Sequence, residues 1–484
     1  MAPSPARTAA FEILLRVETQ QAYAAELLHS GRLTALSAAD RGLCTELVMG
    51  VLRWRSLLDQ RIAHFSFTPF RKLDLEVLTA LRLGAYQIEF LERIPVRAAI
   101  NESVELVKLS RKQSAAPLAN AVLRKIPKSS SEERARRRQG SAAADPIMNE
   151  ELAAASLAGS LAHPPWLVER WMERYGAVKA AAICVGDQRT PATTLRLRPA
   201  HSASAQCASG QDSAAALEEE LWQSGVRVVT GELMKTARRV ISGDPTHSEA
   251  HSQRRIVIQD EASQLIAALV GTGQRILDCC AAPGGKTSAL ADRNPGGEII
   301  ALELHEHRAR LLSRLVSQAN VRVIAADATR LPIDGSFDRI LADVPCSGTG
   351  TLARNPEIKW RLRPEDIADL RARQMAILRA ALPRLEPEGR LVYASCSLEP
   401  EENESVIEEI LDEFRTPDTS VIGLRLLDCR PELQQLRDRG ELLWPDIASL
   451  LQGPFLRTIP GVHPCDGLFA AILERNVAAP RGQD

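Results

Sequence analysis

Two cysteines follow predicted strands in the second half of the chain, each within a short motif of small and polar residues. Cys346 lies in DVPCSGTG, after the predicted strand FDRILADVP, and Cys396 lies in YASCSL, at the end of the predicted strand GRLVYASC. In a parallel sheet the carboxyl ends of neighbouring strands meet at one edge, where ligands and catalytic groups are placed. A single cysteine is more often a buried packing residue. Two thiols at such strand ends, one of them three residues after Asp343, favour nucleophilic chemistry over one pocket.

A turn of small residues stands where an earlier predicted strand, QRILDCC, passes into a predicted helix. Small residues allow a sharp turn and the close approach of a ligand, and a helix N-terminus attracts electron-rich groups. Glu303 closes the next predicted strand and Asp327 the one after it, where a carboxylate can accept hydrogen bonds from ribose hydroxyls. The turn fits neither GxGxxG nor GxxxxGK[ST], so we expect a nucleoside cofactor without phosphates, of which S-adenosylmethionine is the commonest. Its residues are Cys280, Ala281, Ala282, Pro283, Gly284, Gly285 and Lys286.

A methyl donor, thiols and a carboxylate together suit methylation of carbon 5 of cytosine. That carbon becomes nucleophilic once a thiolate has added to carbon 6. Hydrogen bonding at ring nitrogen 3 stabilises the developing charge, and we expect Asp343 to carry or share a proton for this role. A base must later remove the carbon 5 proton. His305 and His307 are candidates that could as easily face solvent, and the spacing leaves open which thiol attacks.

The elements that must position these residues fall into several predicted domains. Residues 1–126 are helical almost throughout, because their apolar residues recur three and four positions apart. Residues 127–150 are a Ser- and Arg-rich linker, and residues 151–255 are a small α+β subdomain. From 256 to 476, short β-rich runs alternate with helical ones, which predicts βαβ units and a parallel sheet covered on both faces. Residues 477–484 are a tail.

Length and composition exclude several classes of protein. The 484 residues suggest two to four domains, and 45% hydrophobic with 25% charged residues is the balance of a soluble globular chain. No apolar run approaches the roughly 18 residues of a membrane span, and the start lacks the apolar core of a signal peptide. The nine cysteines show no CxxC pair, so we expect reduced thiols, no metal site and a cytoplasmic location.

The distribution of charge suggests a contact with a polyanion. The chain has a net charge of −1, but residues 1–126 carry +5 and residues 256–484 carry −8. This segregation favours nucleic-acid binding by the first part and chemistry by the second, although ordinary solvated helix faces would give the same signal. Arg196 and Arg198 alternate on one face of the predicted strand TTLRLRP and are candidates for phosphate contact.

Four stretches, DCCAAPGGKT, DVPCSGTG, RNPEIKWR and YASCSLEPEENE, resemble the RNA cytosine-5 methyltransferases of the Sun/Fmu/RsmB type. The first 126 residues also resemble the NusB-like RNA-binding domain that precedes the catalytic part in the RsmB group, through DRGLCTELVMGVLRWRSLLD and LANAVLRK. The resemblance implies three parts: an all-α NusB-like domain, the small α+β subdomain, and a Rossmann-like class I methyltransferase domain with a mostly parallel seven-stranded sheet.

The resemblance also implies roles for particular residues. It gives attack on the base to Cys396, product release to Cys346 and hydrogen bonding to cytosine to Asp343. It implies that Lys359 and Arg361, in NPEIKWR, face RNA. The implied cofactor contacts are Cys280 through Lys286, Glu303, Arg308, Asp327 and Asp343.

The function expected from this resemblance is S-adenosylmethionine-dependent methylation of carbon 5 of a cytosine in 16S ribosomal RNA. The expected site is the one numbered 967, and the expected enzyme is a cytoplasmic monomer. Three alternatives remain: the same chemistry on transfer RNA, a non-catalytic RNA-binding or assembly factor, and a DNA methylase. The helical first domain argues against the last of these.

Overall fold

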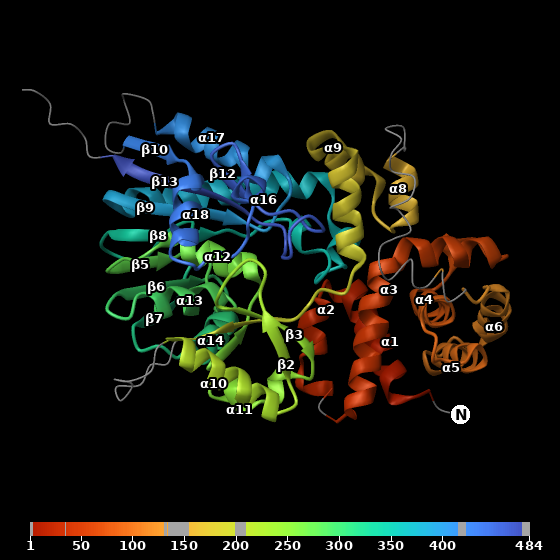
Figure 1. Ribbon diagram of the computed structural model, residues 1–484. Coiled ribbons are helices and arrows are strands. Elements are labelled where there is room, and N and C mark those ends of the chain that lie inside the picture. The colour runs from red at the N-terminus through yellow and green to blue at the C-terminus, as the bar shows by residue number, and fades with distance from the viewer. Residues whose placement is uncertain are drawn as a thin grey trace, which may run out of the picture. The chain divides into compact units, whose positions relative to one another are not determined.

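A computed structural model describes residues 3–33, 35–129, 133, 154–198, 210–414 and 423–476 (Figure 1). The chain divides into two compact units. Unit 1 comprises Met1–Pro191 with Thr351–Arg361, and unit 2 comprises Ala192–Gly350 with Leu362–Asp484. Most of the predicted 127–150 linker and all of the predicted 477–484 tail lie outside the described residues.

Unit 1 is built from helices, as the spacing of its apolar residues predicts. A Cβ atom on Gly50 of α3 would lie 2.0 Å from the ring of Tyr86 in α4, so glycine lets the two helices approach closely around that ring. The described helices of unit 1 are α1 (Pro5–Gln20), α2 (Ala24–Leu28), α3 (Ala38–Phe65), α4 (Leu75–Phe90), α5 (Val96–Leu109), α6 (Ala116–Lys125), α8 (Ala154–Ser160), α9 (Pro165–Gln188) and α15 (Ile358–Arg361).

The division into units differs from the predicted boundaries in two places. Helices α8 and α9 belong to unit 1, whereas the sequence analysis grouped their residues with the small α+β subdomain. The segment Thr351–Arg361 also belongs to unit 1, although the chain on both sides of it belongs to unit 2. The residues directly after the Cys346 motif are therefore part of a different compact unit from the motif itself.

Unit 2 contains a small antiparallel sheet, as predicted for part of the α+β subdomain. Its strands are β1 (Thr194–Leu197), β2 (Arg227–Thr230), β3 (Ala237–Ser242) and β4 (Ile256–Ile258), in the order β2-β3-β1-β4. Leu195 and Leu197 of β1 pack against Leu217 and Leu221 of α10 (Gly210–Gln223). The short helix α11 (Glu249–Ser252) lies between β3 and β4.

The large sheet of unit 2 is mixed, and the five strands predicted from alternating β-rich and helical runs form its parallel part. The order is β11-β12-β13-β9-β8-β5-β6-β7, with β10 paired to β13, which makes nine strands rather than the predicted seven. Strands β5 to β9 pair in parallel, whereas the later strands pair antiparallel. The strands are β5 (Arg275–Asp278), β6 (Glu298–Glu303), β7 (Val321–Ala325), β8 (Phe337–Asp343), β9 (Leu385–Ser395), β10 (Gly423–Leu427), β11 (Leu451–Gln452), β12 (Phe455–Arg457) and β13 (Phe469–Asn476).

Helices cover both faces of this sheet, which confirms the predicted α/β architecture (Figure 1). In β6, Ile299 and Ala301 face one layer, while Ile300 and Leu302 face the other, as the period-two geometry of a strand requires. The first layer holds α12 (Glu261–Val270), α13 (Gly285–Arg293), α14 (Glu306–Leu315) and α18 (Cys429–Asp438); the second holds α16 (Pro364–Ala381) and α17 (Glu404–Glu413).

Candidate functional site

The predicted cofactor turn lies between β5 and α13. Gly284 has φ +113°, and a Cβ there would lie 2.6 Å from Val316 and 2.7 Å from Leu312, so this position requires glycine. The backbone N–H of Ala281 donates to the carbonyl of Leu302 on the neighbouring strand β6 at 2.8 Å. The turn is thereby fixed against the sheet edge, with the start of α13 directly after it.

Asp278, the last residue of β5, is a buried carboxylate beneath this turn. One oxygen, Oδ2, accepts a hydrogen bond of 2.7 Å from the Thr287 hydroxyl. Among the described residues the other, Oδ1, has no hydrogen-bond partner. Burial raises the pKa of Asp278 to about 7, and the charge of Asp343 adds to the rise. An unpartnered buried acceptor at this place is available to a donor group of a ligand.

The next two strands bring further carboxylates to the same edge. Glu303 ends β6 and is buried; its Oε1 accepts from the backbone N–H of His305 at 2.9 Å and lies 3.8 Å from Arg308. Asp327 follows β7, and hydrogen bonds from the backbone N–H and hydroxyl of Thr329 lower its pKa. The predicted acids therefore stand at consecutive strand ends. His305, a candidate base, has an exposed side chain.

The two predicted thiols meet at this edge. Asp343 of β8 pairs with Ala394 of β9, so the loops that follow these strands run side by side. The sulfur atoms of Cys346 and Cys396 lie 3.2 Å apart, and the backbone N–H of Cys396 donates to the sulfur of Cys346 at 3.2 Å. The hydrogen bond between Cys346 and Cys396, followed by burial, raises the pKa of Cys346 well above its ordinary value.

Lys286 connects the cofactor turn to the thiols. Its ammonium group lies 2.7 Å from Asp343 Oδ2. Burial lowers the pKa of Lys286, but the charge of Asp343 and the hydrogen bond to it outweigh burial, so the pKa is raised. In this structure Asp343 accepts a hydrogen bond from the Lys286 ammonium, and the expectation that it carries or shares a proton toward cytosine stays a prediction.

The structure contradicts the prediction that Arg196 and Arg198 contact RNA. Arg196 is 5% exposed, and its Nη1 lies 2.6 Å from Asp292 of α13. Arg198 Nη2 lies 2.8 Å from the other oxygen of the same carboxylate. Arg196 of β1 and Arg198, which directly follows that strand, both reach the same carboxylate on α13. Asp292 is thus shared by two cations inside unit 2.

Lys359 and Arg361 bind protein groups within unit 1, whereas the resemblance implies that they face RNA. Lys359 is 2% exposed, and its ammonium donates to the carbonyls of Arg53 at 2.9 Å and Ala162 at 3.0 Å. Burial lowers its pKa to about 7. Arg361 donates to three carbonyls around the end of α1, those of Val17, Gln21 and Ala22. These cations hold the segment Thr351–Arg361 within unit 1.

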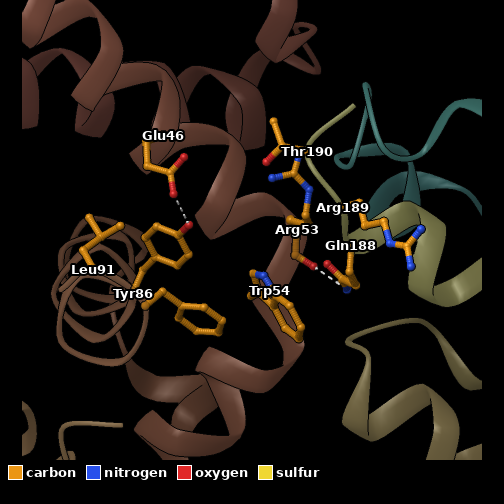
Figure 2. A pocket seen from close by; sticks show the side chains of 9 residues that line it. Glu46, Arg53, Trp54, Tyr86, Leu91, Gln188, Arg189 and Thr190 are labelled. Carbon is orange, nitrogen blue, oxygen red and sulfur yellow. Dashed lines mark hydrogen bonds between the residues drawn. The ribbon is translucent and has the colours of Figure 1, made fainter. Parts of the chain in front are cut away.

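Unit 1 also contains a cavity of about 650 Å³ (Figure 2). Trp54 and Tyr86 pack against Phe90 with ring centroids 5.0 and 4.9 Å away, and the Tyr86 hydroxyl donates to Glu46 at 2.8 Å. The buried Arg53 guanidinium adds a cation to the lining, and burial lowers its pKa. The lining residues include no thiol, so the cavity lacks the groups on which the predicted chemistry depends.

Sequence reasoning missed several residues at the thiol site. Glu402 and Gln374 are fully buried and make hydrogen bonds to the two cysteine loops. The repeated Cys-Ser pair and the acid-rich LEPEENE were signals in the sequence, but neither one indicates that the acid turns back to the serines.

Two absences are observed over the residues that the structure describes. No group of three or more His, Cys, Asp or Glu side chains in this part of the chain is arranged to hold a metal ion. No helix within the described ranges combines the length and apolar character needed to cross a membrane.

Comparisons with solved structures agree with this fold. The crystal structure of PH0851 superposes with a TM-score of 0.72 at 22% identity, covering 98% of this chain and 99% of that one. A methyltransferase homologue from Pyrococcus horikoshii gives a TM-score of 0.52 at 24% identity, covering 68% of this chain and all of the other. At these identities the likeness is one of fold, and the shared fold is the Rossmann-like architecture of unit 2 with its strand-end site.

Sequence comparisons give the family. Residues 268–474 match the model described as 16S rRNA methyltransferase RsmB/F, and residues 4–128 match the NusB family. The probable ribosomal RNA small subunit methyltransferase B of Bacillus subtilis is 34% identical over 85% of this chain and 89% of its own length. The Pseudomonas putida ribosomal RNA small subunit methyltransferase B is also 34% identical, over 85% and 88%. The chain belongs to the RsmB/F methyltransferase family and carries a NusB domain.

Membership of this family makes the protein an RNA methyltransferase with S-adenosylmethionine as its cofactor. The observed edge fits that molecule. Glu303 offers a carboxylate at the position where ribose hydroxyls are bound in such folds. The unpartnered oxygen of Asp278 provides a buried acceptor beside it.

Proposed function

We propose that this protein methylates carbon 5 of a cytosine in 16S ribosomal RNA, at the position numbered 967, through a transient bond between Cys396 and the base. The pair of sulfur atoms 3.2 Å apart carries this proposal, because a scaffold protein has no need of two thiols at one strand edge. The relatives named small subunit methyltransferase B support the RNA substrate. The reaction takes place in the cytoplasm, and the protein acts as a monomer.

The chain's own residues perform the steps at the base. The Cys396 thiolate adds to carbon 6 of cytosine, and the electron pair of the ring double bond makes carbon 5 nucleophilic. When bound, S-adenosylmethionine supplies the electrophilic methyl group that carbon 5 takes up. A base then removes the carbon 5 proton, and the carbon–sulfur electron pair returns to Cys396 as the ring double bond re-forms.

Lys286 and Asp343 support these steps as a charged pair. The Asp343 carboxylate can accept a hydrogen bond from the amino group of cytosine, which holds the ring in place. The Lys286 ammonium interacts electrostatically with Cys396, whose sulfur begins the reaction. Each of these two charges, on Lys286 and on Asp343, is compensated by the other at 2.7 Å.

The neighbouring thiol has a separate role. The raised pKa of Cys346 keeps its proton on, so it is a weak nucleophile beside a reactive one. We assign Cys346 to release of the methylated RNA, as the resemblance implies. This assignment requires the two thiols to differ in reactivity although they lie in contact.

Two matched variants test the proposal. Cys396→Ala abolishes methylation and forms no covalent adduct, because the attacking sulfur is gone. Cys346→Ala forms the adduct but releases it slowly, so a protein–RNA band accumulates on a denaturing gel. Bisulfite sequencing of the 16S RNA reports the site, and bulk transfer RNA serves as the competing substrate. An adduct with Cys396→Ala and none with Cys346→Ala would reverse the assignment of the thiols; methylation of transfer RNA alone would refute the proposed substrate.

A further inference from the structure

Glu402 is a buried carboxylate that joins the two cysteine loops. It ends the short 3-10 helix η8 (Pro400–Glu402) and is 0% exposed. Its Oε1 accepts from the backbone N–H of Ser347 and from Gln374 Nε2, both at 2.9 Å. Its Oε2 accepts the hydroxyls of Ser347 at 2.5 Å and Ser397 at 2.6 Å. Each of these serines directly follows one of the cysteines, so one carboxylate holds both loops.

The groups around Glu402 complete a buried network. Gln374 Nε2 also donates to the carbonyl of Pro345 at 2.9 Å. The Tyr393 hydroxyl donates to Gln374 Oε1 at 3.2 Å and to the backbone carbonyl of Glu402. A buried polar network in which the groups are satisfied favours one arrangement over others. The two sulfur atoms are therefore held at their spacing in part by the hydrogen bonds of Glu402 and Gln374 to the loops that carry them.

The same carboxylate acts on the thiols through its charge. Cys346 is held in the thiol form by its hydrogen bond with Cys396 and by burial, and the negative charge of Glu402 further raises its pKa. Cys396 instead interacts electrostatically with the cation of Lys286. Two sulfur atoms in contact thus have neighbours of opposite charge, an acid for one and an ammonium group for the other.

We propose that Glu402 is a positioning residue that fixes both cysteine loops, so that Cys396 is oriented for attack and Cys346 is held beside it as a distinct thiol. The proposal rests on the proposed function for the identity of the attacking thiol. The effect of Glu402 on Cys346 is a property of the protein without RNA, and it can be measured separately.

The first test follows the reactivity of Cys346 in the full-length protein without RNA. Iodoacetamide alkylates thiolates, and peptide mass spectrometry reports its rate at each cysteine from pH 6 to pH 10. Glu402→Gln keeps the shape of the side chain and removes the charge, so the alkylation profile of Cys346 shifts by about one pH unit toward lower pH. Glu408→Gln makes the same change at an exposed position of α17 and leaves the profile unchanged. Equal profiles for wild type and Glu402→Gln would overturn the proposal.

The second test follows attack on RNA, with a 16S fragment containing 5-fluorocytidine, in which fluorine at carbon 5 blocks release of the adduct. Glu402→Gln lowers the rate of adduct formation about tenfold while S-adenosylmethionine affinity stays at the wild-type value, because the change displaces the loops rather than the cofactor turn. Adduct formation at the wild-type rate in this variant would overturn the positioning role.

If Glu402→Gln does not fold, two serine variants test the role of Glu402 instead. Ser397→Ala and Ser347→Ala each remove one hydroxyl donor and leave the carboxylate charge in place. We expect each to slow adduct formation about threefold, with the alkylation profile of Cys346 less shifted than in Glu402→Gln. Wild-type adduct rates in both serine variants would contradict the network. If wild-type protein forms no adduct with the RNA, the proposed function fails, and the alkylation profiles still decide the role of Glu402.

Discussion

Lys286 in unit 2 and Lys359 in unit 1 are both removed from bulk water, yet their pKa values move in opposite directions. Burial lowers the pKa of Lys359 to about 7, because its ammonium is removed from water and bound by neutral carbonyl groups without a carboxylate close enough to offset the desolvation. Lys286 is also subject to burial, but Asp343 at 2.7 Å holds its pKa above the ordinary value. The difference between the two lysines is a close counter-charge: Lys286 has one and keeps its charge for chemistry, whereas Lys359 has none as close among the described residues and anchors a segment.

The largest expected effect is a loss of catalytic rate in the variant Lys286→Met. Methionine has a similar length and no charge, so Asp343 loses its cation and Cys396 loses the attraction of the ammonium. We expect the single-turnover methylation rate on 16S RNA to fall by about 100-fold or more, as when one preorganised charge-stabilising donor is removed. Lys286→Arg, which keeps the charge with a different shape, should retain more activity. A Lys286→Met rate within threefold of wild type would contradict a chemical role for this cation.

The second prediction concerns the pH dependence of stability in unit 1. The folded pKa of Lys359, about 7, lies below the roughly 10.4 of an exposed lysine, so the unfolded chain binds more protons between these values. Stability rises with pH across that window, by at most about 1.4 kcal/mol per pH unit from this group, and its contribution is flat below pH 7. Hydrogen exchange in α3 and α9 at pH 7, 8 and 9 measures the slope.

Lys359→Met is the matched control for that slope. It removes the titrating group and should flatten the rise in protection, while methylation stays within about threefold of wild type. Arg53, Asp187, His163 and Cys184 also face this lysine. Burial lowers the pKa of His163 and raises that of Cys184, so neither changes charge between pH 7 and 9. An unchanged slope in Lys359→Met would show that another group titrates.

The catalytic edge could be predicted from the sequence because its signals are local. Each strand is a short apolar run, and the functional residue stands where that run ends, as at Glu303, Asp343 and Cys396. Parallel pairing then brings the strand ends together without further information. The place of the cofactor turn and the meeting of the two thiols both follow from the rule that parallel strands end at one edge of the sheet.

The partners of the buried charges could not be predicted in the same way. Alternation places Arg196 and Arg198 on one face of the predicted strand, but the sequence does not say that Asp292, nearly a hundred positions later, binds both. The resemblance implies that Arg361 faces RNA, and nothing in the sequence says that its guanidinium binds carbonyls at the end of α1 instead. Glu402 was hidden for a similar reason, because an acid-rich segment is ordinarily exposed.

The smallest expected effect is that of Arg361→Met, and it extends the comparison to a cation bound by carbonyls near the surface. Its guanidinium donates to Gln21 at 2.9 Å and to Val17 at 2.8 Å. Losing these bonds should destabilise unit 1 by about 1–2 kcal/mol, measured by denaturant unfolding monitored through hydrogen exchange in α1. If instead Arg361 neutralised a phosphate, the slope of log RNA affinity against log salt concentration would become shallower by about 0.9 in Arg361→Met. Because these carbonyls already occupy the guanidinium, we expect the slope to match that of wild type, and a loss near 0.9 would restore Arg361 as an RNA contact.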